Sequence, residues 1–202
     1  EPGKERRSRE KLYVDGVEVR VLAERVQYYD AHGNLVTESF TAFSRKNIRK
    51  VYASLDDFLT QWNAADRKSA ILVELLERGV LLDELQTEVG REFDPFDLIC
   101  HVAYDRPALS RSERARKVKG QALFDKYEAT ARQVLTALLD RYTNEGIEAL
   151  EEALDASKLR NMLLIPPFSQ MGRPMEIVQS FGGTTSYLQA VRQLRQQIYT
   201  AA

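Results

Sequence analysis

Cysteine and histidine are scarce in this chain, and their scarcity excludes several kinds of site. Its 202 residues include one cysteine, Cys100, and two histidines, His32 and His101. One cysteine allows neither an internal disulfide nor a multi-cysteine zinc site, so we expect a protein of the reducing cytoplasm. Cys100 and His101 are adjacent, and on a helix their side chains point about 100° apart, which argues against a nucleophile–base pair.

Long apolar runs and nucleotide or metal motifs are also missing. No stretch approaches the roughly 20 apolar residues of a membrane helix, so we expect no membrane contact. The chain has no phosphate-binding loop ending in Gly-Lys-Ser/Thr, no Gly-x-Gly-x-x-Gly motif and no His-Glu-x-x-His motif. We therefore expect no catalytic residue, no cofactor-binding residue and no metal ligand here. The chain begins with Glu1 rather than methionine, which we interpret as a piece of a longer protein.

Net charge and composition are those of an ordinary globular protein. Hydrophobic residues make up 44% and charged residues 29%, with a net charge of −1. The total charge therefore favours neither a nucleic acid nor an acidic partner, and only the distribution of charge can do so.

The first part of the chain carries the signal for β-strands. Val17, Val19 and Val21 alternate with polar residues, as in a half-buried strand. The stretch 30–34 contains Gly and Asn for a turn, and residues 35–43 form a second run rich in β-branched and aromatic residues. These features predict an antiparallel β-hairpin or small meander.

The rest of the chain predicts helices. Apolar residues recur at helical spacing, and Ser44, Ser54 and Ser110 are candidate N-caps. Pro95 follows Asp94 as the first residue of another helix, and residues 121–143 have the longest uninterrupted helical pattern. Phe58, Trp62, Phe124 and Tyr127 fit this spacing as core residues.

The fold class that these patterns predict is mainly α, a helical bundle-like domain with a small N-terminal antiparallel β-hairpin. We expect residues 1–11 to be a charged linker and residues 12–44 to be the β-hairpin segment, packed on the helical part. Residues 45–202 form the helical C-terminal domain, of which about 163–202 make a closing subunit.

Charge is distributed unevenly along the chain. Residues 44–50 and 111–119 each have a net charge of +4, whereas residues 74–97 have a net charge of −6. The basic segments are candidates for contact with DNA phosphates. The alternative is that their side chains pair with acidic segments of the same domain. The candidate DNA contacts are Arg45, Lys46, Arg49, Lys50, Arg111, Arg114 and Lys117.

An acidic helix is predicted over residues 147–154, between Glu145 and Asp155. It is either a solvated face or an electrostatic contact for a basic partner.

The last third of the chain has the most distinctive pattern. A double proline, a Gly-x-Pro turn and a Gly-Gly break separate short apolar segments, and no nucleophile or metal-ligand set lies among them. The double proline is a stiff segment. It is either a connector that packs Phe168 into the core or an edge for docking a partner. The candidate docking residues are Pro166, Pro167, Phe168, Phe181 and Tyr187.

Several tracts, in this order, resemble one known family. Residues 96–104, 109–115, 165–169, 176–178 and 181–183 resemble the C-terminal domain of the R subunit of type I restriction enzymes. The resemblance runs from about Lys11 to Tyr199 and rests on separated tracts rather than on one motif.

This resemblance implies a parent that is an ATP-dependent, site-specific deoxyribonuclease. Such an R subunit has a nuclease domain and two motor domains, and it joins a methyltransferase core of modification and specificity subunits. ATP and Mg²⁺ are expected only in those motor and nuclease domains, and the present residues alone should be inactive. The expected role is assembly, attaching the translocase and nuclease to the core. The alternative is an auxiliary helical module that binds the DNA backbone.

Overall fold

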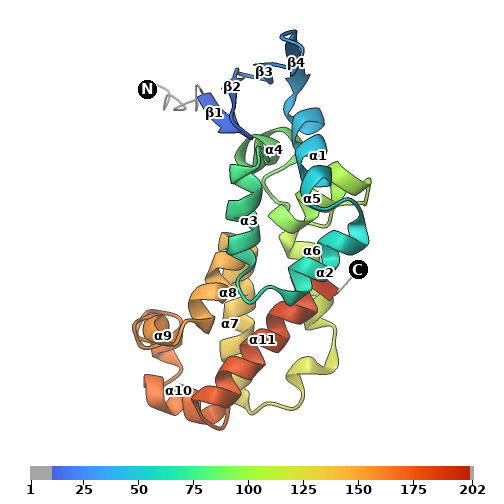
Figure 1. The fold of residues 1–202 in the computed structure, drawn as a ribbon. Coiled ribbons are helices and arrows are strands. Elements are labelled where there is room, and N and C mark those ends of the chain that lie inside the picture. Colours follow the sequence, from blue (N-terminus) through green and yellow to red (C-terminus); the bar gives the residue numbers. More distant parts are fainter. Residues whose placement is uncertain (1–10, 201–202) are drawn as a thin grey trace, which may run out of the picture. The chain divides into compact units, whose positions relative to one another are not determined.

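Eleven α-helices and a small antiparallel sheet make up the part of the chain that the structure describes, residues 11–200 (Figure 1). The structure is a computed structural model. The predicted mainly α fold with a small N-terminal antiparallel sheet is confirmed. The described residues divide into two compact units, which we call the first unit (residues 11–66 and 70–108) and the second unit (residues 67–69 and 109–200).

The sheet of the first unit has four strands, each antiparallel to the next. Val14 and Val17 are paired across a two-residue turn, in which Asp15 and Gly16 have φ of 49° and 79°. Positive φ at both positions suits the tight hairpin turn that matches the twist of the strands. The strands are β1 (Lys11–Val14), β2 (Val17–Val21), β3 (Arg25–Tyr29) and β4 (Leu35–Ser39).

The turn predicted over residues 30–34 joins β3 to β4. The carboxylate of Asp30 accepts hydrogen bonds from the backbone N–H groups of His32 and Asn34, and Gly33 has a φ of 79°. The strand expected to run from Leu35 to Phe43 is shorter than predicted, because β4 ends at Ser39 and a helix begins at Phe40.

Ser39, and not Ser44, is the N-cap of this helix. The Ser39 hydroxyl accepts a hydrogen bond from the N–H of Ala42. Ser44 lies inside the helix and is buried, and its hydroxyl accepts a hydrogen bond from the N–H of Leu81 at 3.1 Å. A serine that looks like a cap thus connects two segments of the first unit.

Two other predicted helix starts in the first unit are confirmed. Ser54 accepts a hydrogen bond from the N–H of Asp57, and Asp94 accepts one from Phe96, with Pro95 as the first helical residue. The helices are α1 (Phe40–Val51), α2 (Leu55–Ala64), α3 (Lys68–Glu77), α4 (Leu82–Val89) and α5 (Pro95–Tyr104).

Aromatic rings form the core of the first unit. Phe58 and Trp62 are fully buried, as predicted, and the ring of Phe58 lies 5.4–6.4 Å from four others: Tyr52, Trp62, Phe96 and Tyr104. The Tyr104 hydroxyl donates to the Tyr52 carbonyl at 2.6 Å, and burial raises the pKa of Tyr104 to about 12. These contacts hold α2 and α5 together.

The second unit contains the remaining helices. The N-cap predicted at Ser110, the start of α6, is confirmed. It forms a capping box, since the Ser110 hydroxyl accepts from the N–H of Glu113 and the Glu113 carboxylate accepts from the N–H of Ser110. The elements are α6 (Arg111–Lys119), η1 (Ala122–Phe124), α7 (Ala129–Glu145), α8 (Ile147–Leu154), α9 (Ala156–Leu163), η2 (Phe168–Gln170), α10 (Pro174–Ser180) and α11 (Thr184–Thr200).

The helix expected over residues 121–143 is interrupted. A short 3-10 turn, η1, is followed by a bend, and α7 begins only at Ala129. The bend places the ring of Tyr127 5.8 Å from that of Phe181, and both Tyr127 and Phe124 are half-buried rather than central. This contact between distant residues is absent from the local pattern that predicted one helix.

The central contacts of the second unit involve its two long helices, α7 and α11. Helix α7 packs on α6, α8 and α10, and α11 packs on α6, α8 and α10. The fully buried tyrosines, Tyr142 and Tyr187, come one from each of these helices.

The residues predicted as a β segment, 12–44, lie in the first unit with α1, α2, α4, α5 and all of α3 beyond Ser69. Residues 163–200 of the predicted closing subunit lie within the second unit. Residues 1–10 of the predicted linker are outside the described residues.

Candidate functional site

The basic segment of α1 is engaged in internal contacts at three of its four cations. The two terminal guanidinium nitrogens of Arg45, Nη1 and Nη2, each donate to an oxygen of the Asp105 carboxylate at 3.1 Å. Arg49 donates from Nε to the Ala103 carbonyl at 2.7 Å. Lys50 is exposed and lines a hollow of about 270 Å³.

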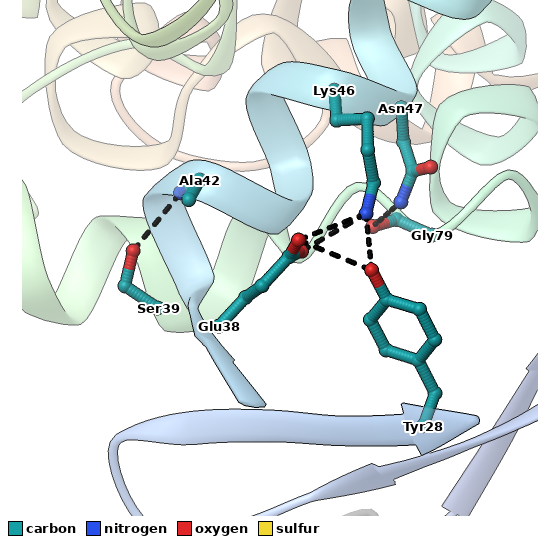
Figure 2. Close-up of polar contacts among 7 residues, drawn as sticks. All are labelled: Tyr28, Glu38, Ser39, Ala42, Lys46, Asn47 and Gly79. Atoms are coloured by element: carbon teal, nitrogen blue, oxygen red, sulfur yellow. Dashed lines mark hydrogen bonds and ion pairs between the residues drawn. The ribbon is translucent and has the colours of Figure 1, made fainter. Parts of the chain in front are cut away.

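The fourth cation, Lys46, belongs to a polar cluster that joins the sheet to α1. Figure 2 shows its amine pointing at the Tyr28 hydroxyl and at both oxygens of the Glu38 carboxylate, 3.0 and 3.1 Å away. The Tyr28 hydroxyl also donates to Glu38 at 3.1 Å. At the next position of α1, the buried Asn47 donates to the Gly79 carbonyl at 3.1 Å. We call Tyr28, Glu38, Lys46, Asn47 and Gly79 the α1 cluster.

The electrostatics of the α1 cluster are those of a satisfied structural contact. Burial by itself lowers the pKa of Lys46, but the hydrogen bonds that Lys46 donates to Tyr28 and Glu38 outweigh it, and the pKa is raised overall. The Lys46 amine also lies 4.7 Å from the centre of the Tyr28 ring. A cation held by a carboxylate, a hydroxyl and a ring has little capacity left for a phosphate.

The basic stripe predicted on α6 is divided by the fold. Arg114 is buried and donates to the Ile198 carbonyl at 2.8 Å, and its guanidinium lies over the Tyr199 ring. Arg111 donates to the Thr143 carbonyl at 3.0 Å. Lys117 is exposed. Of the predicted stripe, only Lys117 therefore presents its charge fully to solvent.

The acidic helix α8 is partly engaged within the second unit. Glu152 contacts Arg141 at 3.3 Å, and Glu151 accepts a hydrogen bond from the Ser69 N–H. Asp155 caps α9 by accepting from the N–H of Ser157, and hydrogen bonds from Ser157 lower the pKa of Asp155.

The candidate docking residues of the last third divide into buried and exposed groups. Phe168, Phe181 and Tyr187 are buried, at 1%, 9% and 0% exposure. The Tyr187 hydroxyl donates to the Ala153 carbonyl at 3.0 Å, and burial raises the pKa of Tyr187. Pro166 and Pro167, joined by a cis peptide bond, are exposed. The three aromatic residues therefore belong to the core, and of the five candidates only the two prolines are exposed to solvent.

Three exposed apolar residues of this tract were not among the docking residues predicted from the sequence. Leu164, Ile165 and Met175 are 56%, 59% and 75% exposed. A signal was available for the first two. Residues 162–165 are four consecutive apolar residues, and a helix that buries one face leaves part of such a run in solvent. Met162 and Leu163 are the buried half.

A groove lies beside the double proline. It has a volume of about 680 Å³ and is bounded on one side by α7 and on the other by Pro167 and Met171. Its α7 wall is mostly polar and includes the exposed Arg132. Its lining thus combines the charged side chains of Arg132, Asp140 and Arg141 with apolar atoms.

Cys100 and His101, adjacent in the sequence, have different surroundings in the structure. Cys100 is buried, and His101 makes a 2.9 Å hydrogen bond from Nδ1 to the Arg106 carbonyl. Between residues 11 and 200, no group of three or more His, Cys, Asp or Glu side chains could hold a metal ion. No helix in that range is long and apolar enough to cross a membrane.

Comparison with known proteins identifies the family of the chain. A family profile described as EcoEI R protein C-terminal matches residues 38–199. The chain is also 44% identical, over 199 residues, to the Escherichia coli protein named type I restriction enzyme EcoAI endonuclease subunit. The chain belongs to the EcoEI R protein C-terminal family. The predicted resemblance to the C-terminal domain of type I R subunits is therefore confirmed.

The matches differ in how much of each protein they cover. The alignment with the EcoAI subunit covers 98% of this chain but 24% of that protein, so the chain spans about a quarter of the length of the curated relative. The match to the EcoEI R protein C-terminal family begins at Glu38, near the end of β4, and includes every helix described above. No solved structure matches the chain.

Proposed function

We propose that this domain is an assembly module of a type I restriction endonuclease. It attaches the ATP-driven translocase and nuclease to the core of modification and specificity subunits during DNA restriction. The relative is named as a subunit, which supports a multi-subunit complex. ATP and Mg²⁺ belong, in this proposal, to motor and nuclease domains outside these residues. A cytoplasmic location, expected from the single cysteine, is part of the same proposal.

The observation that carries the proposal is the exposed apolar segment around the double proline. Exposed apolar residues that are contiguous, as Leu164 to Pro167 are, mark surfaces for protein contact. Leu164, Ile165 and Met175 lie within the part of the chain that matches the family. Contact with other subunits is the role that this surface supports best.

Direct binding tests the assembly role. The 202-residue chain, labelled with a fluorophore, is titrated with the cognate core of modification and specificity subunits. We expect saturable binding, and unlabelled full-length R subunit should displace the chain. Binding that full-length R subunit leaves undisturbed would contradict the proposal.

Contact with the DNA backbone is a second candidate function. It is favoured by the exposure of Lys50, Arg116 and Lys117, because an exposed cation can approach a phosphate. The internal contacts of Arg45, Lys46, Arg49, Arg111 and Arg114 make these five residues weaker candidates.

Fluorescence anisotropy with a duplex of about 30 base pairs tests this second candidate. Changing Arg116 and Lys117 together to Glu should weaken DNA binding and reduce the slope of log K against log salt by about 2. An unchanged slope would exclude α6 as a DNA contact.

A further inference from the structure

Five exposed apolar residues of the second unit lie within a twelve-residue stretch. Leu164, Ile165 and Met175 are more than half exposed, and Pro166 and Pro167 between them are exposed as well. We call these five residues the 164–175 surface. In the described helices of the first unit, Val73 is the one large apolar side chain with comparable exposure, at 54%.

The exposure of this surface is built into an ordered segment. Leu163, Phe168 and Ile177 are at most 1% exposed and anchor the segment at its two ends and in its middle. The Ile165 N–H donates to the Met162 carbonyl, and the Ile165 carbonyl accepts from the Ser169 N–H, both at 3.2 Å. The backbone is therefore held while the side chains of Leu164 and Ile165 remain in solvent.

The same part of the chain is cationic. Residues 156–175 include Lys158, Arg160 and Arg173 and contain no Asp or Glu. All three cations are exposed, and within residues 11–200 none of them forms an ion pair. The acid that follows, Glu176, accepts a hydrogen bond from the Arg173 N–H. This arrangement differs from that of α1, where carboxylates of the same unit already occupy the cations.

The groove beside α7 adds a recess to this surface. Pro167 belongs both to the 164–175 surface and to the groove, which also receives Met171. On the α7 wall, Arg141 is engaged by Glu145 and Glu152, and Asp140 by Lys119. Arg132, on the same wall, is exposed and forms no ion pair within the described range. An apolar side chain entering the groove would therefore lie beside a cation.

We propose that the 164–175 surface binds an acidic protein segment that carries apolar anchor residues, presented by the core of modification and specificity subunits. The inference rests on the assembly function proposed above and identifies the surface and the chemistry of its partner. Its apolar residues bury anchors of the partner, and Arg160, Arg173 and Arg132 face carboxylates around them. Such a division between an apolar centre and a charged rim is typical of protein interfaces.

The test uses the full 202-residue chain and the cognate core in the titration described above. Leu164→Ser with Ile165→Ser should raise the dissociation constant roughly tenfold or more, because truncated anchors dominate interface energies. Arg160→Glu with Arg173→Glu should raise it by about tenfold at low salt, and by less as salt is added. Far-ultraviolet circular dichroism checks that each variant remains folded.

Matched controls lie in the first unit. Val73→Ser removes a similarly exposed apolar side chain, and Arg106→Glu reverses an exposed charge, so both should bind the core as the wild type does. Failure of the wild-type chain to bind would overturn the assembly function and this inference together. Wild-type binding that the Leu164/Ile165 variant retains would overturn the inference alone.

Two further outcomes decide the chemistry of the partner. If the Leu164/Ile165 variant loses binding to the core while the Arg160/Arg173 variant binds it as the wild type does, an acidic partner is excluded. If the Arg160/Arg173 variant instead binds the core normally but loses affinity for a duplex of about 30 base pairs, the cations serve DNA and the proposal is wrong.

Discussion

The α1 cluster and the 164–175 surface use charged and apolar side chains in opposite ways. In the α1 cluster, Lys46 is held by Glu38 and Tyr28, and Asn47 by the Gly79 carbonyl (Figure 2). On the 164–175 surface, the neighbouring Arg160 and Arg173 form no ion pair in the described chain, and large apolar side chains remain in solvent. The first region is complete within its own unit, whereas the second retains its capacity for contact. Two basic segments that look alike in a sequence can therefore differ in whether their charges are already paired within the fold.

The largest expected effect on stability comes from Gly79 in the α1 cluster. Gly79 has a φ of 89°, and a Cβ there would lie 2.7 Å from both Asn47 Nδ2 and Val14 Cγ2. We expect Gly79→Ala to lower the free energy of unfolding by about 3 kcal/mol, because strain and overlap act together. Urea denaturation measures this change.

Gly33 provides the control for this substitution. It has a φ of 79°, but no atom lies within 4 Å of its Cβ position. Gly33→Ala should therefore cost only about 1 kcal/mol. Equal losses for the two glycines would show that packing at Gly79 contributes nothing.

Arg114 offers the next largest effect and extends the comparison to α6. Arg114→Ala should destabilise the protein by about 2–3 kcal/mol, because it removes a buried donor to the Ile198 carbonyl. Lys117→Ala, at an exposed position of the same helix, should change stability by no more than about 0.5 kcal/mol. Thermal or urea unfolding of both variants measures these changes. Similar losses of unfolding free energy in the two variants would contradict the prediction.

Lys46 should contribute a smaller, pH-dependent term. Its pKa in the folded protein is raised above the ordinary value of 10.5, so its contribution is fully present below about pH 10. The contribution is lost as the pH rises through the folded-state pKa. Lys46→Met should cost about 0.5–1 kcal/mol at pH 8 and progressively less above pH 10.5.

Urea midpoints between pH 8 and pH 11.5 measure this dependence for the wild type, Lys46→Met and the exposed control Lys50→Met. Tyrosines away from the α1 cluster ionise alike in all three proteins, whereas Tyr28 contacts Lys46, so the difference between the proteins reports Lys46 together with Tyr28. A loss that is independent of pH would assign the effect of Lys46 to packing alone.

The smallest effect on stability is expected at the 164–175 surface. Leu164→Ser with Ile165→Ser should change the free energy of unfolding by no more than about 0.5 kcal/mol, since both side chains are already in solvent. Ile177→Ala, in the core of the same unit, should cost about 2–4 kcal/mol. A large loss in the double variant would mean that the surface serves folding rather than binding.

Helix starts with short-range hydrogen bonds were predictable from the sequence. Ser54, Asp94 and Ser110 each cap a helix through a partner two or three residues away, so a window of a few residues contains the whole interaction. The alternation of valines in β2 and the turn before β4 were local in the same sense.

The misassigned elements depend on distant partners. Ser44 resembles a cap in its own surroundings, but its hydroxyl is used by Leu81, 37 positions away. The bend before α7 coincides with a contact between Tyr127 and Phe181. Arg114 looks like part of an exposed stripe, yet it bonds to Ile198, 84 positions away. No window on the sequence includes these pairs.

The docking residues predicted from the sequence lie in the same tract as the exposed apolar residues of the structure, but most of them are buried. Phe168, Phe181 and Tyr187 are three of the predicted docking residues. They lie in the core because burying their large apolar side chains is favourable. Leu164 and Ile165 follow Met162 and Leu163, where α9 ends, and a segment that packs one side on the core cannot bury all four. Which pair is buried depends on how α9 packs on its neighbours.

By itself, the sequence determined the family, the helical class, the position of the sheet and the absence of nucleotide and metal motifs. These properties follow from residue identity, periodicity and contacts within one or two turns. Only the tertiary structure decided which cations are neutralised within the chain and which apolar residues remain exposed. Neutralisation and burial depend on segments that lie far apart in the sequence and meet only on folding.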